Sequence, residues 1–127
     1  MPALAIIDDD QDARDALTEF LRGHGFLAFG VARGEQALRF LGAVKVDLVI
    51  TDLHMPEMSG DVLVTEIRAR IPYADRLPII MLSGDDLARR DGPHLFYVQK
   101  PPDPDELLET VTRLIAARRP AAGVTTA

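Results

Sequence analysis

Short unbroken runs of apolar residues recur along this chain, and longer segments with a helical repeat separate them. An unbroken run is typical of a strand that a parallel sheet buries on both faces, whereas alternation is typical of a sheet with one face in water. Leu48-Val49-Ile50 is the clearest such run. The pattern predicts five strands, at residues 4–7, 26–31, 48–51, 78–84 and 95–100.

The segments between these runs carry apolar residues three or four positions apart, which indicates helices with one face on the core. They predict helices at residues 11–22, 34–41, 60–70 and 104–119. The last has the strongest start, because Asp103 can cap it, Pro104 takes its first position and Glu106 follows three residues after the cap. Strands that alternate with helices predict an α/β fold, in which helices cover both faces of a parallel sheet.

The connection between the fourth and fifth strands breaks this regularity. Residues 84–94 contain one large apolar residue, Leu87, and Gly92-Pro93 would stop a helix. At most about two helical turns fit there, with little to anchor them. We therefore expect the fourth crossover helix to be shortened or mobile.

Length and charge narrow the class of function. A chain of 127 residues suits one domain, and 47% hydrophobic with 27% charged residues is typical of a globular one. The net charge of −6, without a basic stripe, argues against direct binding of nucleic acid. The chain has no cysteine, which excludes disulfides and thiol chemistry, and its apolar runs are shorter than the roughly 20 residues of a membrane span.

Polar side chains stand where four of the predicted strands end. Asp8 and Asp9 follow the first strand, Asp52 the third, and Ser83 and Lys100 end the fourth and fifth. The carboxyl ends of parallel strands share one edge of a sheet, where open α/β sheets place their sites. If the first and third strands are neighbours, three carboxylates meet there and call for a cation. Carboxylates, Mg²⁺, a hydroxyl and a lysine together make a phosphoryl-acceptor site.

A row of aspartates at a strand end also has an ordinary interpretation. Asp8-Asp9-Asp10 can form a solvated turn that caps the next helix, and we expect Asp10 or Gln11 to serve as that cap. The polar groups on the other strand ends favour the metal-site interpretation for Asp8 and Asp9.

Four segments carry these strand ends in a fixed order. They are Ile6-Ile7-Asp8-Asp9-Asp10, Asp52-Leu53-His54-Met55-Pro56 with Ser59-Gly60, Leu82-Ser83-Gly84, and Tyr97-Val98-Gln99-Lys100-Pro101. Together the segments resemble the receiver domain of two-component response regulators, over residues 3 to about 117. The resemblance implies a doubly wound, five-stranded parallel sheet in the flavodoxin-like order 2-1-3-4-5, an order taken from chemotaxis-regulator relatives and not from this sequence.

The resemblance also implies an acceptor and a metal site. Asp52 would accept a phosphoryl group from a phosphohistidine of a sensor kinase or phosphotransfer protein. Asp9 would bind Mg²⁺ directly and Asp8 mostly through water, with Asp52 and the backbone carbonyl of His54 as further ligands. The chain would assist its own phosphorylation and dephosphorylation without being an enzyme.

A conformational switch is implied as well. Ser83 would bond a phosphoryl oxygen once Asp52 is modified, and Lys100 would pair with the same group. Tyr97 matches the aromatic switch position, whose ring turns inward when the hydroxyl residue moves toward the phosphate. The resemblance further implies a cis peptide bond between Lys100 and Pro101.

The same resemblance sets the expected organisation. Residues 1–119 would form the receiver domain and residues 120–127 a disordered tail or the start of a linker. Because Met1 stands just before the first strand, we expect a cytoplasmic stand-alone or N-terminal receiver without a signal peptide. Its partners would be the phosphodonor and a downstream protein, with no nucleic acid or membrane bound directly. The protein would be a monomer or a phosphorylation-dependent dimer.

Two other functions stay open. A pseudo-receiver would bind its partner without phosphorylation, which the shortened fourth helix favours and the intact set of strand-end residues disfavours. A Mg²⁺ phosphohydrolase of the haloacid dehalogenase type would also use an aspartyl nucleophile, and Asp8-Asp9-Asp10 contains its Asp-x-Asp spacing. Asp12 stands where that class has Thr or Val, and no substrate cap is present, so this alternative is weaker.

Overall fold

The computed structural model describes residues 1–84 and 92–118. In chain order the elements are β1 (Ala3–Ile7), α1 (Gln11–Gly23), β2 (Leu27–Val31), α2 (Gly34–Ala43), β3 (Leu48–Asp52), α3 (Gly60–Arg70), the 3₁₀ helix η1 (Pro72–Arg76), β4 (Ile79–Ser83), β5 (Leu95–Gln99) and α4 (Pro104–Arg118). Every predicted strand and helix within these residues is present, with ends that agree within one or two positions. The 3₁₀ helix η1 was not predicted from the hydrophobic pattern.

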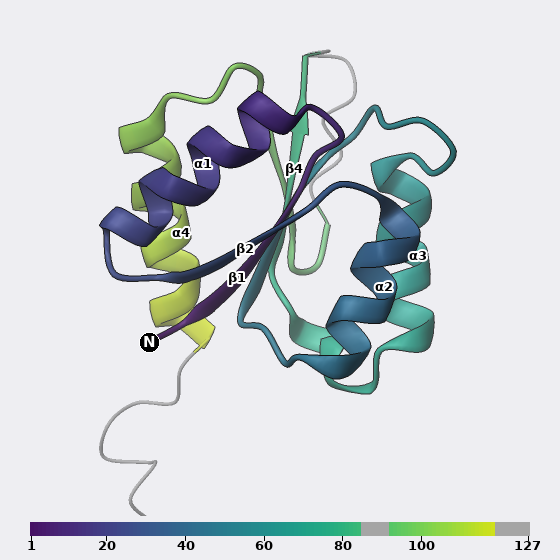
Figure 1. The fold of residues 1–127 in the computed structure, drawn as a ribbon. Helices are drawn as coiled ribbons and strands as arrows, with labels where there is room; N and C mark the ends of the chain where they lie inside the picture. The colour runs from purple at the N-terminus through teal and green to yellow at the C-terminus, as the bar shows by residue number, and fades with distance from the viewer. Residues whose placement is uncertain (85–91, 119–127) are drawn as a thin grey trace, which may run out of the picture.

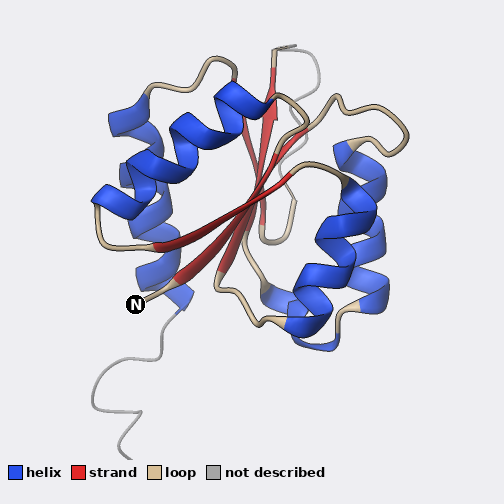
Figure 2. Ribbon diagram, viewed as in Figure 1, coloured by secondary structure: helices blue, strands red, loops and turns tan. Residues whose placement is uncertain are grey.

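The strands form one parallel sheet in the order β2-β1-β3-β4-β5, which confirms the order that the resemblance implied. The helices flank it on both sides: α1 and α4 cover one face, and α2 and α3 cover the other (Figure 1). Coloured by secondary structure, the strands form a single twisted layer between the two pairs of helices (Figure 2). This is the doubly wound α/β architecture.

Burial on both faces explains why the central strands are apolar without alternation. All residues of β1, β3 and β4 are buried. Along β1, Leu4 and Ile6 pack in the core under α1 and α4, whereas Ala5 and Ile7 pack in the core under α2 and α3. Successive side chains point to opposite faces of a strand, so each face of the sheet receives an apolar set.

Local capping sets the start of two helices. Asp10 caps α1, because its side chain accepts hydrogen bonds from the backbone N–H groups of Asp12 and Ala13. Asp103 does the same for α4, accepting from Asp105 and Glu106. Asp103 was the predicted cap of its helix, and of the two candidates for α1, Asp10 and Gln11, the structure selects Asp10. Both caps begin a helix at the carboxyl edge of the sheet.

Arg68 of α3 binds the backbone just before β5 begins. One guanidinium nitrogen of Arg68 donates to the carbonyls of Ala74 and Leu77 at 2.6 and 2.8 Å, and the other donates to the His94 carbonyl at 3.1 Å. His94 has a φ of 58°, so the chain turns sharply just before β5. The described residues between β4 and β5 contain no helix, and the predicted short fourth helix falls on residues 85–91, outside the described part. None of the described helices combines the length and apolarity needed to cross a membrane.

Tyr73 of η1 joins three backbone groups at the end of α2. Its hydroxyl oxygen lies 2.9 Å from the Leu41 carbonyl and 3.0 Å from the Val44 carbonyl, and it accepts from the Val46 N–H at 3.3 Å. Burial raises the pKa of Tyr73 above its ordinary value of 10.0, and the Val46 hydrogen bond opposes this shift. The protonated hydroxyl therefore stabilises the turn between α2 and β3.

We expect Tyr73→Phe to lower the free energy of unfolding by about 1–3 kcal/mol at neutral pH, because buried carbonyls lose their donor. Since the folded-state pKa is raised, the advantage of the parent persists up to the ordinary tyrosine pKa. It is lost as the pH rises through the folded-state value. Urea unfolding of both proteins from pH 7 to pH 11 measures this difference. Equal stabilities at pH 7 would contradict it.

Candidate functional site

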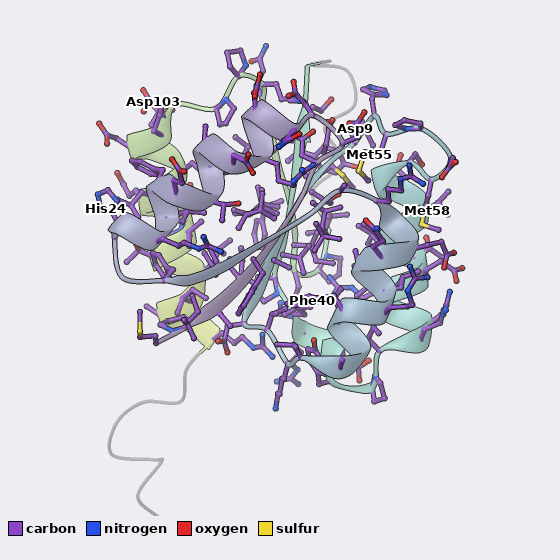
Figure 3. All side chains as sticks on the ribbon, in the orientation of Figure 1. Asp9, His24, Phe40, Met55, Met58 and Asp103 are labelled. Carbon is purple, nitrogen blue, oxygen red and sulfur yellow. The ribbon has the colours of Figure 1, made fainter. Side chains whose placement is uncertain are left out.

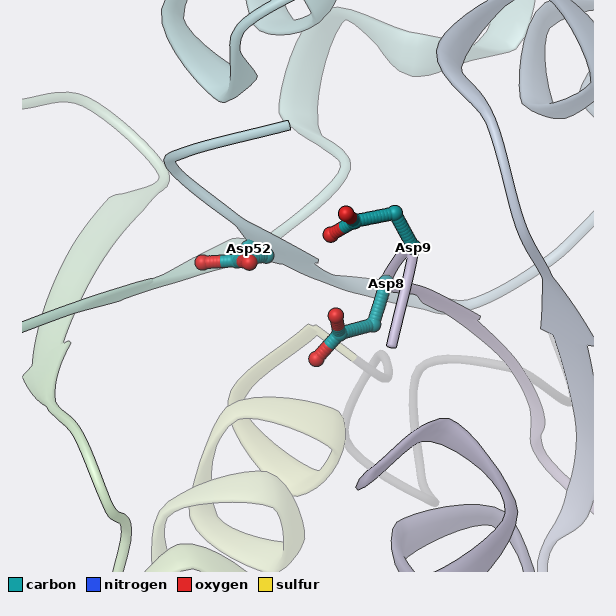
Figure 4. A group of neighbouring side chains, drawn as sticks. All are labelled: Asp8, Asp9 and Asp52. Carbon is teal, nitrogen blue, oxygen red and sulfur yellow. The ribbon is translucent and has the colours of Figure 1, made fainter. Parts of the chain in front are cut away.

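Three carboxylates meet at the carboxyl edge of the sheet. β1 and β3 are paired neighbours, so Asp8, just after β1, and Asp52, the last residue of β3, come together with Asp9. One oxygen from each of the three lies within 4.8 Å of the others. The close-up shows the three side chains near one another (Figure 4). Asp8 and Asp52 are each 5% exposed, whereas Asp9 is open to solvent.

Lys100 supplies the positive charge of this group. Its Nζ lies 3.2 Å from Asp52 Oδ1, and its backbone N–H donates to the Ser83 carbonyl at 2.8 Å. The hydrogen bond extends the β4–β5 ladder by one step and so carries Lys100 to the site. The peptide bond from Lys100 to Pro101 is cis, as predicted.

Ser83 and His54 lie at the same edge in different settings. Asp52 pairs with Leu82 across β3 and β4, and Ser83 is the next residue along β4, 3% exposed. His54 is exposed in the loop after β3, and its backbone N–H donates to Asp52 Oδ1 at 3.4 Å. The structure thus brings Asp8, Asp9, Asp52 and Lys100 together, with Ser83 and the His54 backbone beside them.

The electrostatics of the site follow from burial and crowding. Burial raises the pKa of Asp8, and the charges of Asp52 and Asp9 raise it further. The Asp10 N–H, which donates to Asp8 at 3.0 Å, and the charge of Lys100 oppose the shift. A carboxyl group with a raised pKa is one whose ionised form the fold disfavours.

This donor set fits a hard divalent cation. Its ligand atoms are carboxylate oxygens, which Mg²⁺ prefers, and Asp9 leaves one side open to the waters that Mg²⁺ retains. Among the residues that the structure describes, three carboxylates meet one ion-paired lysine, and a cation would offset this excess of negative charge. The arrangement can therefore hold a metal beside a carboxylate that is itself a potential nucleophile.

Tyr97 of β5 belongs to a small apolar cluster of its own. It is 6% exposed and packs with Leu53 and Met81. Its hydroxyl donates to Asp61 Oδ1, in the first turn of α3, at 2.9 Å. Asp61 was not among the predicted site residues, although its place directly after Ser59-Gly60, which belong to one of the segments that carry the resemblance, was a usable signal.

Gly60 lets α3 begin directly against the site. A Cβ added to it would stand 2.6 Å from the Asp52 carbonyl oxygen and 2.9 Å from Leu53 Cα. Its N–H donates to the Leu53 carbonyl at 2.7 Å. Any larger residue would push the first turn of α3 away from Asp52.

An apolar cleft of about 370 Å³ opens beside the site, between α1 and α4. Its lining residues are Asp8, Ala13, Ala16, Leu17, Phe20, Leu82, Lys100, Pro102, Pro104 and Leu107. The apolar stripe predicted for residues 11–22 thus only partly enters the core. Leu21 is fully buried, whereas Ala13 and Ala16 stay exposed on the cleft. In the view with all side chains, Asp9 stands at the site end of α1 and His24 at the opposite end (Figure 3).

Known proteins are similar to this chain in sequence and fold. The family model described as "Response regulator receiver domain" matches residues 4–112. The C4-dicarboxylate transport transcriptional regulatory protein DctD of Rhizobium meliloti is 35% identical over 93% of this chain, which spans only 26% of that protein's length.

Two solved structures extend the comparison. A putative response regulator from Chloroflexus aurantiacus is 33% identical, with a TM-score of 0.81 over 91% of this chain and 98% of that one. The response regulator protein TrrA from Thermotoga maritima, solved in complex with Mg(2+)-BeF, is 32% identical, with a TM-score of 0.79 over 90% and 99% of the two chains.

Asp8→Asn should stabilise the metal-free protein at pH 7, by about 1 kcal/mol, because it removes a buried charge from a crowded site. Since the folded-state pKa of Asp8 is raised, the gain should disappear as the pH falls toward 3.8, where the parent carboxyl is protonated as well. Urea unfolding in a chelator at both pH values measures it.

The matched control for Asp8→Asn is Asp12→Asn, at an exposed aspartate in the first turn of α1. It should change stability little. A loss of stability in Asp8→Asn at pH 7 would contradict the electrostatic account of the site.

Proposed function

The chain belongs to the response regulator receiver domain family, and on this premise we propose that Asp52 accepts a phosphoryl group from a phosphohistidine. The donor is a sensor histidine kinase or a histidine phosphotransfer protein. The observation that carries the proposal is a strand-end carboxylate, 5% exposed, with Lys100 Nζ at 3.2 Å and two further carboxylates beside it. We assign residues 1–119 to the receiver domain and expect this domain to lie in the cytoplasm.

The transfer is an exchange of one bond for another. A carboxylate oxygen of Asp52 attacks the phosphorus, the P–N bond to the donor imidazole breaks, and the imidazole leaves with the bonding electron pair and takes up a proton. The product is an acyl phosphate on Asp52. Lys100, already paired with Asp52, offsets the negative charge that the phosphoryl group adds. Water attack on phosphorus reverses the modification and releases inorganic phosphate.

We assign the metal to the same carboxylates. Asp8, Asp9 and Asp52, with the backbone carbonyl of His54, would hold Mg²⁺. When bound, the ion would neutralise oxygens of the phosphoryl group during transfer. The Mg(2+)-BeF complex of TrrA, a relative with 32% identity, supports this assignment.

The signal passes on through a change of conformation. Ser83, at the end of β4, would bond a phosphoryl oxygen, and Tyr97 would respond through its ring position. Phosphorylation biases an existing equilibrium of this kind by adding charge and acceptor oxygens. A downstream protein would then bind the altered surface. This chain would act as a monomer or a phosphorylation-dependent dimer and would bind no nucleic acid directly.

Incubation with Mg²⁺ and acetyl phosphate, followed by intact-mass measurement, tests the acceptor. We expect one phosphoryl adduct in the parent, none in Asp52→Asn, and none when a chelator removes the metal, because the attacking carboxylate and its cation are each required. An adduct that persists in Asp52→Asn would overturn the assignment.

If the parent forms no adduct with acetyl phosphate, a phosphorylated histidine donor is the decisive second test. Transfer from that donor would support Asp52 as an acceptor that needs its kinase. Failure with both donors would favour a pseudo-receiver that binds its partner without phosphorylation. Turnover of a generic phosphate ester would instead favour the phosphohydrolase alternative.

The cleft between α1 and α4 suits the phosphodonor protein. A donor imidazole has to reach Asp52, so the donor must cover surface at this edge of the sheet. The cleft includes Asp8 and Lys100 in its lining and is otherwise apolar. An apolar helix face of the donor would bury there the side chains of Ala13 and Ala16, which stay exposed in the free protein.

Ala16→Gln should slow phosphoryl transfer from a histidine donor about tenfold, because a longer side chain would fill the docking surface. Modification by acetyl phosphate should be unchanged, since a small donor needs no docking. The matched control is Asp15→Gln, which puts the same side chain on the residue just before Ala16, an exposed position of α1. Equal slowing by both variants, or none, would argue against docking in this cleft.

A further inference from the structure

A hydrogen bond joins the buried tyrosine of β5 to α3, the helix that follows residues 53–59, the acceptor loop after Asp52. Tyr97 donates to Asp61 Oδ1 at 2.9 Å, and Asp61 is the second residue of α3. The donor ring is 6% exposed, whereas Asp61 is an exposed residue at the surface. Hydrogen bonds to a charged acceptor are stronger than those between neutral groups.

The ring is enclosed by the same segments that frame the site. Its cluster contains Leu53, directly after Asp52, and Met81 of β4, with Val64 of α3 packed against them. The ring of Tyr97 therefore packs among apolar side chains, and Asp61 accepts a hydrogen bond from its hydroxyl. A buried tyrosine hydroxyl needs such a partner.

Asp61 cannot move independently of the acceptor loop. It follows Gly60, whose N–H donates to the Leu53 carbonyl at 2.7 Å and where an added Cβ would stand 2.6 Å from the Asp52 carbonyl oxygen. Ser59 fixes the same turn, because its hydroxyl accepts from the Val62 N–H at 3.3 Å. A displacement of the loop after Asp52 would therefore be passed to Asp61 within one helical turn.

From these contacts we infer that Asp61 is a positioning residue: it holds Tyr97 inward before any modification and links the position of that ring to the Asp52 loop through the first turn of α3. The inference rests on the proposed function for its signalling role. It adds a second connection from Asp52 to Tyr97, besides the one that runs through Ser83. The ring would start from an inward position, so phosphorylation acts on an equilibrium that Asp61 has already biased.

Tyrosine fluorescence can test this directly. The chain has two tyrosines and no tryptophan, so Tyr97 is the only emitter in a Tyr73→Phe background. In that background we compare acrylamide quenching of the parent with Asp61→Ala, Asp61→Asn and Asp105→Ala. Asp105 is the matched control, since it is an exposed acidic residue in the first turn of α4 and its carboxylate makes no hydrogen bond within the described residues.

We expect the quenching constant to rise about twofold or more in Asp61→Ala, because losing the acceptor shifts the ring toward exposed positions. Asp61→Asn keeps an amide oxygen at this place and should show a smaller rise. Asp105→Ala should match the parent, and circular dichroism checks that each variant is folded. Parent-like quenching in Asp61→Ala, or an equal rise in Asp105→Ala, would overturn the inference.

A second measurement tests the link to Asp52. Mg²⁺ and acetyl phosphate are added to the parent and to Asp61→Ala, both in the Tyr73→Phe background. Tyr97 emission is recorded for each, and intact mass gives the amount of phosphoryl adduct. We expect the emission change per phosphoryl adduct to differ at least about twofold between Asp61→Ala and the parent, because the ring of the variant starts from a less inward position and lacks the link through α3. An unchanged response would overturn the link. If no adduct forms with acetyl phosphate, a phosphorylated histidine donor replaces it. Failure with both donors would overturn the proposed function, while the quenching comparison still decides whether Asp61 holds the ring.

Discussion

Mutual repulsion of three carboxylates at one edge of the sheet is the constraint on which this structure depends. Asp8 and Asp52 are each 5% exposed, and Asp9 completes the group within 4.8 Å. Lys100 is the one cation that forms an ion pair with this group among the described residues. A fold that concentrates charge in this way gives up stability in its empty state and recovers it on binding a cation, which is the physical basis of a site that responds to ligands.

The helix α3 connects that edge to the rest of the molecule. Its first turn packs against the Asp52 carbonyl, through Gly60, and accepts the Tyr97 hydroxyl. Near its other end, Arg68 donates to the His94 carbonyl at the entry to β5. One helix therefore contacts both the acceptor loop and two positions on the β4–β5 side of the sheet. A small shift at the site can reach β5 without passing through the segment between β4 and β5.

Most of the fold was predictable because local rules and burial agree. Strands buried on both faces have to be apolar throughout, and helix starts need a side chain that accepts backbone N–H groups, so Leu48-Val49-Ile50, Asp10 and Asp103 could be interpreted directly. The 3₁₀ helix η1 was missed, since a five-residue segment shows no periodicity. The Arg68 contacts were missed as well, because its acceptors are backbone carbonyls that any sequence provides.

The sequence by itself determined the alternation of strands and helices, the chemistry at each strand end and, through its resemblance to receiver domains, the family. Those features depend on residue type and on order along the chain. Only the tertiary structure decided that Asp61 accepts from Tyr97, that Gly60 must be small, and that part of the apolar stripe of α1 lines an open cleft. These depend on distances between segments far apart in sequence, which a hydrophobic pattern does not encode, because it records whether a residue is buried and not which neighbour buries it.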